Sequence, residues 1–217
     1  MRTIQWTVEY GTGMLMLDQP PSNTMTMDFF REMKVIMDEI TAGQDLKAVI
    51  IFGNGRHYSS GADISELLQH VDQQVMLENY RAFAQLEHLD IPVISAIRGV
   101  CLGSAFELAL FSHFRICSTD AVLGLPESSF NLIPGIGGIQ RVAKLAGMAK
   151  AIEITLRGNT FPAAEALAMG LVDIVVPKGQ VLDLAITFAR VLPWNTDKVN
   201  RQFYLHKYLN QLHATAS

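Results

Sequence analysis

Short apolar runs alternate with longer segments of helical periodicity along most of this chain. Residues 49–52 and 92–97 are almost continuously apolar, which is typical of strands buried on both faces of a parallel sheet. Apolar residues elsewhere recur at intervals of three and four, as on one face of an amphipathic helix. Further strands are predicted at 114–117, 121–123 and 172–176, and helices at 27–40, 64–88, 105–111, 137–157, 162–169 and 182–192. This alternation predicts an α/β architecture.

The two ends of the chain add a hairpin and a terminal helix. Residues 3–10 alternate apolar and polar side chains, and after a glycine-containing turn residues 14–17 return as the second strand. A proline break precedes a last predicted helix at 198–212. We therefore expect a core domain over residues 1–192 and a C-terminal helical appendage over residues 193–217.

Composition excludes several classes of function. Seventeen basic and twenty-one acidic residues give a net charge of −4, so no broad basic surface is available for nucleic acid. No apolar run reaches the ~18 residues of a membrane span. Cys101 and Cys117 make no disulfide framework, and the scattered histidines show no metal-binding spacing, so no metal is expected. The first ten residues lack the apolar stretch of a signal peptide, and we expect a cytoplasmic protein.

A glycine-containing turn at residues 59–64, Ser-Ser-Gly-Ala-Asp-Ile, leads into a predicted helix. Gly61 permits a tight turn, and Asp63 can cap the helix that follows. The Ala62 amide near such a helix start can bind a partial negative charge. Taken alone, an ordinary capped turn explains these residues better than a binding site.

The predicted helix at 105–111 is the second segment of interest. It follows Gly103 and Ser104, and apart from Glu107 the residues on its packing face are small or apolar. Ser104 offers another outward-facing amide, and Glu107 lies about one turn further on the same side. A glutamate on an apolar helix is seldom plain surface decoration. The competing explanation is a first-turn glutamate that complements the helix dipole.

A third segment combines Glu127 with the glycine-rich turn in residues 133–141. Two carboxylates and several helix-start amides suit a reaction that forms and quenches an enolate. A phosphate-binding loop is a competing use of the glycines, but the Lys-Ser/Thr ending of a P-loop and the dinucleotide fingerprint are both absent. A serine hydrolase built on His57, Ser59 and Ser60 is disfavoured, because these residues are nearly adjacent and no orienting acid is evident.

Four segments resemble, in order, the signatures of the enoyl-CoA hydratase/isomerase (crotonase) family. The similarity runs from about residue 4 to residue 176 without a large insertion. It implies a ClpP/crotonase-like spiral of repeated ββα units that binds an acyl-CoA thioester. The segments are Ser60-Gly61-Ala62-Asp63, Gly103-Ser104-Ala105-Phe106-Glu107-Leu108-Ala109, Pro126-Glu127 with residues 134–141, and residues 163–172.

The resemblance implies a role for each matching position. The backbone amides of Ala62 and Ser104 form an oxyanion hole that stabilises the enolate. Glu107 and Glu127 hold a water molecule and carry out acid/base chemistry, with the Gly135 amide as a further contact to the water. Other substrate-binding positions implied by the motifs are Ser60, Gly61, Asp63, Ile64 and Gly103.

The implied reaction is hydration of a 2-enoyl-CoA to the 3-hydroxyacyl-CoA, or the reverse dehydration. Isomerases of the family often use only the position of Glu127, so the presence of both Glu107 and Glu127 favours a hydratase. CoA enters as part of the substrate, no other cofactor is expected, and the resemblance implies a trimer or hexamer. One alternative is an isomerase or a decarboxylase of the same family that acts on an acyl thioester, which includes a carrier-bound substrate in polyketide tailoring. The other alternative is a catalytically weak binding or assembly subunit.

This chain also departs from the family pattern. Ser104-Ala105-Phe106 replaces a run of glycines, and we expect these side chains to narrow or reshape the pocket. Residues 128–131, Ser-Ser-Phe-Asn, replace a more apolar stretch. The C-terminal helical region is shortened relative to the family, which predicts a more open pocket suited to an acyl group on an acyl carrier protein.

Overall fold

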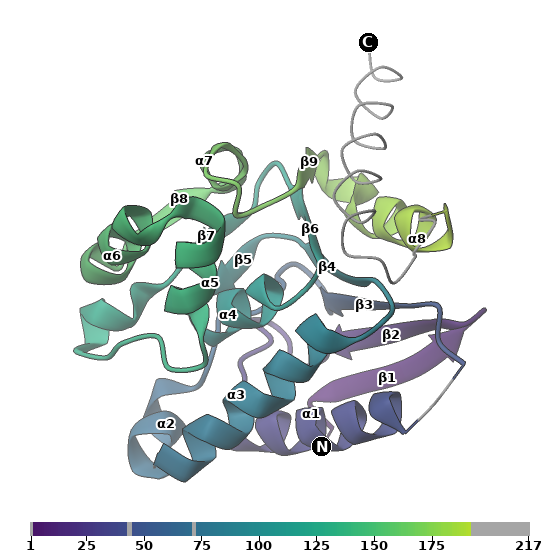
Figure 1. Ribbon diagram of the computed structural model, residues 1–217, viewed down its shortest axis with the longest axis horizontal. Helices are drawn as coiled ribbons and strands as arrows, with labels where there is room; N and C mark the ends of the chain where they lie inside the picture. The colour runs from purple at the N-terminus through teal and green to yellow at the C-terminus, as the bar shows by residue number, and fades with distance from the viewer. Residues whose placement is uncertain (1, 43–44, 71–72, 192–217) are drawn as a thin grey trace.

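Two β-sheets form the framework of the protein. The computed structural model describes residues 2–42, 45–70 and 73–191 (Figure 1). The larger sheet has the order β1-β2-β3-β4-β6-β9, with β1 antiparallel to β2 and the other neighbours parallel. Its strands are β1 (Ile4–Glu9), β2 (Thr12–Leu17), β3 (Ala48–Gly53), β4 (Val93–Ile97), β6 (Phe114–Ser118) and β9 (Ile174–Val176). The smaller sheet contains β5 (Val100–Leu102), β7 (Val122–Gly124) and β8 (Thr160–Pro162), in that order.

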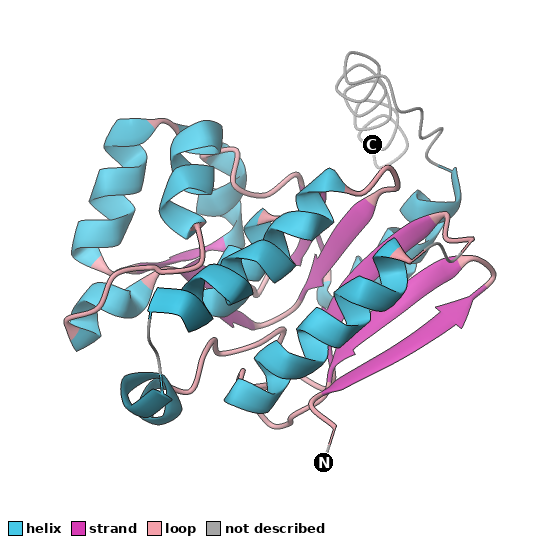
Figure 2. Ribbon diagram, turned by 60° about the horizontal axis from the view of Figure 1, so that its bottom comes forward, coloured by secondary structure: helices cyan, strands magenta, loops and turns pink. Residues whose placement is uncertain are grey.

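Helices cover both faces of the larger sheet, with α1 and α3 on one face and α8 on the other (Figure 2). Within the described part of the chain, no helix has the length and apolar character needed to cross a bilayer. The α-helices are α1 (Met27–Thr41), α2 (Ile64–His70), α3 (Gln73–His88), α4 (Ser104–Leu110), α5 (Gly138–Ala146), α6 (Met148–Arg157), α7 (Ala163–Ala168) and α8 (Val181–Val191). Residues 2–42, 45–70 and 73–191 also contain two 3-10 helices, η1 (Pro126–Phe130) and η2 (Lys178–Gln180).

The apolar runs in the sequence are explained by burial on two sides. In β3, Val49 and Ile51 belong to the cluster beneath α1, whereas Ile50 belongs to the cluster beneath α8. Successive side chains of a strand point to opposite faces, so a strand covered on both faces needs apolar residues throughout. The helical spacing predicted for residues 27–40 is confirmed, because its six apolar side chains are all buried: Phe29, Phe30, Met33, Ile36, Met37 and Ile40.

The chain passes repeatedly from the larger sheet to the smaller one and then into a helix. Strands β4 and β5 precede α4, and β6 and β7 precede η1 and α5. Two isolated parallel bridges, Met25 with Ala62 and Ser59 with Cys101, continue the second layer into the earlier repeats. The repeated ββα units and the α/β class expected from the sequence are therefore present.

Some local predictions need correction. The predicted helix at 64–88 is two helices, α2 and α3, and the short strands β5 and β8 were not predicted. Three-residue strands are too brief to show a period of two. The segment 137–157 is likewise two helices, α5 and α6, which are separated at Gly147, where φ is 88°. The helix predicted at 198–212, and with it the boundary after residue 192, lies outside the described residues.

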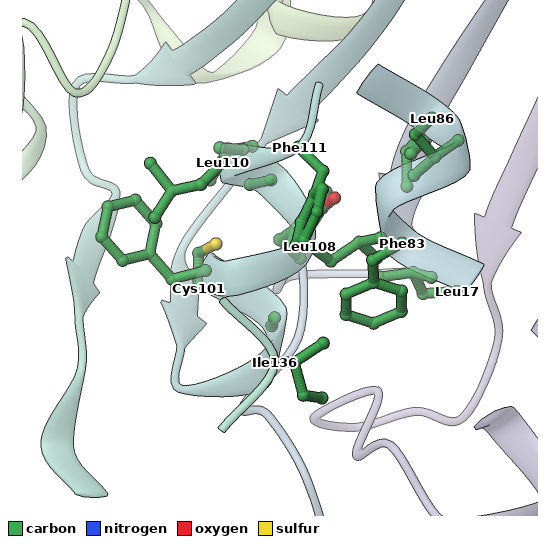
Figure 3. Packing of buried hydrophobic residues seen from close by; sticks show 14 of the residues in the cluster. Leu17, Phe83, Leu86, Cys101, Leu108, Leu110, Phe111 and Ile136 are labelled. Atoms are coloured by element: carbon green, nitrogen blue, oxygen red, sulfur yellow. The ribbon is translucent and has the colours of Figure 1, made fainter. Parts of the chain in front are cut away.

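Helix α4 lies inside the main core. Its seven residues are all buried. Figure 3 shows Leu108 and Phe111 packed among side chains from other elements, including Phe83 of α3 and Ile136. A helix enclosed in this way holds its first turn in a fixed position, and that turn carries two of the predicted site residues.

Candidate active site

Three segments of the second layer end at a common edge, and a predicted site residue follows each of them. The Ser59 amide donates to Val100 O at 3.0 Å, and the Leu102 amide donates to Ser59 O at 3.2 Å, so this segment runs parallel to β5. Strand β5 runs parallel to β7. Ala62, Ser104 and Glu127 follow these three segments within two or three residues. Carboxyl ends of parallel strands are a common place for ligand binding in α/β folds.

The backbone of Gly61 lies against the start of α4. A Cβ atom on Gly61 would be 2.5 Å from Leu102 O and 3.5 Å from Ser104 N, and φ of Gly61 is +93°. This close approach brings the Ala62 amide near the Ser104 amide. Within residues 2–42, 45–70 and 73–191, neither N–H has an acceptor. Two neighbouring N–H groups without partners can receive one oxygen atom.

Hydrogen bonds hold the turn that presents Ala62. Asp63 Oδ1 accepts from the Glu66 amide at 3.0 Å, which confirms its predicted role as the cap of α2. Ser60 N donates to Ser22 O at 2.9 Å, and its hydroxyl lies 3.1 Å from Thr24 Oγ1. Ile64 is the first residue of α2. The turn is therefore fixed from both sides.

Two residues of the serine hydrolase that was disfavoured above, His57 and Ser59, accept hydrogen bonds from backbone amides. His57 Nδ1 accepts a hydrogen bond from the Val100 amide at 3.1 Å. Ser59 Oγ accepts one from the Gly61 amide at 3.0 Å. Both groups stabilise the loop, and neither is arranged as a nucleophile with its base.

Glu107 is a buried carboxyl group held by two amides. Its side chain is 1% exposed, and Oε1 accepts from Ile136 N at 2.9 Å and from Gly138 N at 2.8 Å. Burial raises the pKa of Glu107 to about 7; the negative charge of Glu127 adds to this, whereas the two amides and Arg141 oppose it. A Cβ atom on Gly138 would be 2.7 Å from Glu107 Cγ, so only glycine fits there.

Glu127 lies on η1 above the start of α4. A Cβ atom on Gly103 would be 3.1 Å from Glu127 Oε1, and φ of Gly103 is +53°. Among the described residues, the buried Oε2 atom of Glu127 has no hydrogen-bond partner. Burial raises the pKa of Glu127 to about 7. The site therefore combines two carboxyl groups of raised pKa with two amides that lack acceptors.

The side chains that replace the glycine run do not all face this site. Ala105 and Phe106 are fully buried in the core, and the ring of Phe106 packs edge-on against Phe161 of β8 at 5.9 Å. The expectation that Phe106 narrows the pocket is therefore wrong. Ser128 Oγ and Ser129 lie against Gly158 at the end of α6, which accounts for small polar residues at these positions.

The structure also shows contacts that sequence reasoning missed. The amides of Ile136 and Gly138 donate to Glu107, and neither amide was among the predicted site groups; the contact predicted for the Gly135 amide was with the water molecule. A Cβ atom on Gly135 would be 2.1 Å from Met76 Cε, so α3 covers this turn. Arg141 is 8% exposed. The glycine-rich helix start was a usable signal for the amides, but no pattern distinguishes a buried arginine from a surface one.

The histidine, cysteine and carboxylate side chains do not gather into a metal site in the part of the chain that the structure describes. Cys101 and Cys117 are both buried free thiols. Burial raises the pKa of the Cys101 thiol well above its usual range, so it is not a reactive thiolate at neutral pH.

Fold and site together define a crotonase-type protein, with ββα repeats that bring paired amides and paired carboxyl groups to one edge. The family model for enoyl-CoA hydratase/isomerase matches residues 8–213, and the chain belongs to this family. A protein from Bacillus subtilis named "Probable enoyl-CoA hydratase" is 33% identical over 218 residues, covering 95% of this chain and 84% of that protein.

Longer relatives and solved structures agree with this assignment. The alpha subunit of a fatty acid oxidation complex from Shewanella amazonensis is 41% identical over 82% of this chain, which spans 27% of the subunit's length. An enoyl-CoA hydratase structure from Geobacillus kaustophilus has a TM-score of 0.84 at 28% identity, covering 88% of this chain and 75% of the other. A Thermobifida fusca protein in complex with CoA has a TM-score of 0.81 at 25% identity, covering 99% and 94%.

Proposed function

We propose that this chain hydrates a 2-enoyl-CoA thioester to the 3-hydroxyacyl-CoA and catalyses the reverse dehydration. The observation that carries the proposal is the pair of glutamates at the site, the buried Glu107 and the half-buried Glu127, each with its pKa raised to about 7 by burial. An acid and a base that both titrate near neutral pH suit addition of water across a double bond.

The Ala62 and Ser104 amides bind the thioester oxygen in this proposal. Their N–H groups lack other acceptors among the described residues, so both are available to the substrate. They polarise the carbonyl group and stabilise the enolate that forms when the β-carbon is attacked. Loss of one such donor typically costs ~3 kcal/mol of transition-state stabilisation.

The contacts of the two glutamates suggest separate roles. Glu107 accepts two amide hydrogen bonds on Oε1, which favour its ionised form. It takes a proton from water as the water oxygen bonds to the β-carbon and the double-bond electrons move into the enolate. Glu127 holds its proton and donates it to the α-carbon, and Gly135 provides the further contact to the water. Proton exchange then restores the starting forms of Glu107 and Glu127.

The family and its relatives support CoA as the carrier of the acyl group. The Thermobifida fusca relative binds CoA, and the Shewanella relatives are subunits of fatty acid oxidation complexes. We therefore propose a CoA thioester of fatty acid oxidation as substrate, with no further cofactor, and assembly into a trimer or hexamer.

The test is loss of the ultraviolet absorbance of trans-2-enoyl-CoA thioesters over a series of chain lengths. Glu107→Gln and Glu127→Gln are each expected to lower kcat by at least ~10²-fold, because each removes one proton-transfer step. Glu78→Gln is the matched control, since Glu78 pairs with Lys34 on the surface.

Each other outcome changes the proposal. Full activity in Glu107→Gln together with loss in Glu127→Gln would favour an isomerase that needs one carboxylate. Absence of turnover at every chain length in folded wild-type protein would overturn hydration of free CoA thioesters. The same thioesters on acyl carrier protein would then test for a carrier-bound substrate.

A further inference from the structure

Arg141 is a buried cation with several partners, although its Nε has no hydrogen-bond partner among the described residues. Its guanidinium group pairs with Glu87 of α3, and Nη1 donates to Gly137 O at 3.3 Å. Cζ lies 3.3 Å from the centroid of the Phe111 ring. Enclosing a guanidinium group in this way costs desolvation energy, which the ion pair and the ring contact offset. An arginine at the surface would not bear this desolvation cost, so the buried position of Arg141 suggests a role for its side chain.

The turn beside Arg141 is the one that holds Glu107. Gly137 stands between Ile136 and Gly138, whose amides both donate to Glu107 Oε1. A Cβ atom on Gly137 would be 2.9 Å from Arg141 Nη1 and 3.0 Å from Tyr80 Cε2. The guanidinium group and the Tyr80 ring therefore both pack against Gly137, between the two residues whose amides donate to Glu107.

Charge connects the same groups. The positive charge of Arg141 lowers the pKa of Glu107, against the raising effects of burial and of the Glu127 charge. Burial raises the pKa of Glu87, but hydrogen bonds and charges from Lys144 and Arg141 outweigh it and leave that pKa below its ordinary value. Glu87 is thus ionised at neutral pH and partly compensates Arg141.

We propose that Glu87 and Arg141 are a pair of positioning residues, which hold the turn whose two amides donate to Glu107 and together set the balance of charge beside its carboxyl group. Neither residue is assigned a contact with the thioester. The effect on rate rests on the proposed hydratase function, whereas the effect on Glu107 is measurable without turnover.

The first measurement is the titration of the Glu107 carboxyl carbon by ¹³C NMR in the full chain, with Glu107→Gln used to assign the signal. Arg141→Met removes a positive charge, so Glu107 should titrate at higher pH than in the wild type. Glu87→Gln removes the compensating negative charge, so Glu107 should titrate at lower pH. We expect shifts of roughly half a unit to one unit in opposite directions.

The opposite signs separate this role from a merely structural one, because loss of packing would disturb both variants in the same way. Glu78→Gln is the matched control: it also removes an ion pair from α3, to Lys34 of α1, and should leave the Glu107 titration unchanged. Shifts of the same sign, or no shifts, in the two variants would overturn the proposal.

If Arg141→Met does not fold, the test uses Arg141→Lys and Glu87→Gln instead. Arg141→Lys keeps the charge and should preserve the titration while lowering kcat, since lysine lacks the planar fork.

Kinetics give the second measurement. The acidic limb of the kcat profile should move to higher pH in Arg141→Met and to lower pH in Glu87→Gln, with KM changed less than twofold. Absence of hydratase activity in the wild type, with the expected NMR shifts, would remove the proposed function and leave the positioning pair in place. Normal hydratase activity without the NMR shifts would support the proposed function and overturn the positioning pair.

Discussion

At the scale of single residues, the two site glutamates oppose the stability of the fold. A carboxyl group whose pKa is about 7 when folded, against ~4.3 in an unfolded chain, binds its proton more tightly in the folded state. The resulting cost is absent below the unfolded pKa, grows as pH rises from there to about 7, and is constant above that. Glu107 bears this cost in full because it is buried.

Replacing Glu107 by glutamine should therefore stabilise the protein at alkaline pH. Glutamine can still accept the hydrogen bonds from Ile136 and Gly138 through its own Oε1 but carries no charge to desolvate. We expect the free energy of unfolding to rise by up to about 3 kcal/mol at pH 8, and to be unchanged near pH 4. Urea denaturation at both pH values checks this. A difference that is the same at both would show that Glu107 titrates normally.

The same two groups predict the pH dependence of the proposed reaction. Activity needs Glu107 ionised and Glu127 protonated, and both have pKa values of about 7. The rate should fall on the acidic side as Glu107 gains a proton, and on the alkaline side as Glu127 loses one. We expect kcat measured from pH 5 to 9 to be bell-shaped with its maximum near 7. A plateau extending to pH 9 would exclude a protonated Glu127 as the proton donor.

At the scale of elements, the contact between the 59–62 segment and α4 sets the distance between the two proposed oxyanion-hole amides. Gly61→Ala adds a Cβ atom 2.5 Å from Leu102 O at a φ of +93°, so the segment must move away from β5. We expect a loss of roughly 1–3 kcal/mol in stability and at least a tenfold loss in kcat. Gly147→Ala is the matched control, because its φ is +88° but no atom lies within 4 Å. Equal kcat losses in both variants would show that the close approach is unimportant.

The elements also show how far sequence reasoning reached. The apolar spacing of α1 predicted its buried face, and the motif order predicted that Ala62, Ser104, Glu107 and Glu127 belong to one site. The glycine-rich helix start indicated that amides would be available near the site, but which of them donate to Glu107 could not be predicted, because their direction depends on the positive φ of Gly137 and on a side chain four residues later. Phe106 was misplaced for a related reason. Its side-chain direction depends on its contact with Phe161 in β8, a strand too short to predict.

At the scale of the whole molecule, the larger sheet separates the site from the cluster beneath α8. Phe188 is fully buried there, and its ring packs edge-on against Phe114 of β6 at 5.0 Å. Glu107, in contrast, lies on α4, whose apolar residues belong to the cluster on the other face. Stability and chemistry should therefore respond separately to changes beneath α8.

Phe188→Ala tests this separation. The substitution removes a buried ring and should lower the free energy of unfolding by about 3–5 kcal/mol, because the sheet cannot collapse to fill the space. The kcat per folded molecule should stay within twofold of the wild type, since none of the proposed site residues belongs to that cluster. Val191→Ala is the control at the end of the same helix; its side chain is 45% exposed and its removal should cost little. Denaturant unfolding and kcat at a temperature where both variants are folded measure the two effects. A kcat that falls together with stability in Phe188→Ala would show that the sheet transmits changes from α8 to the proposed site at Glu107 and Glu127.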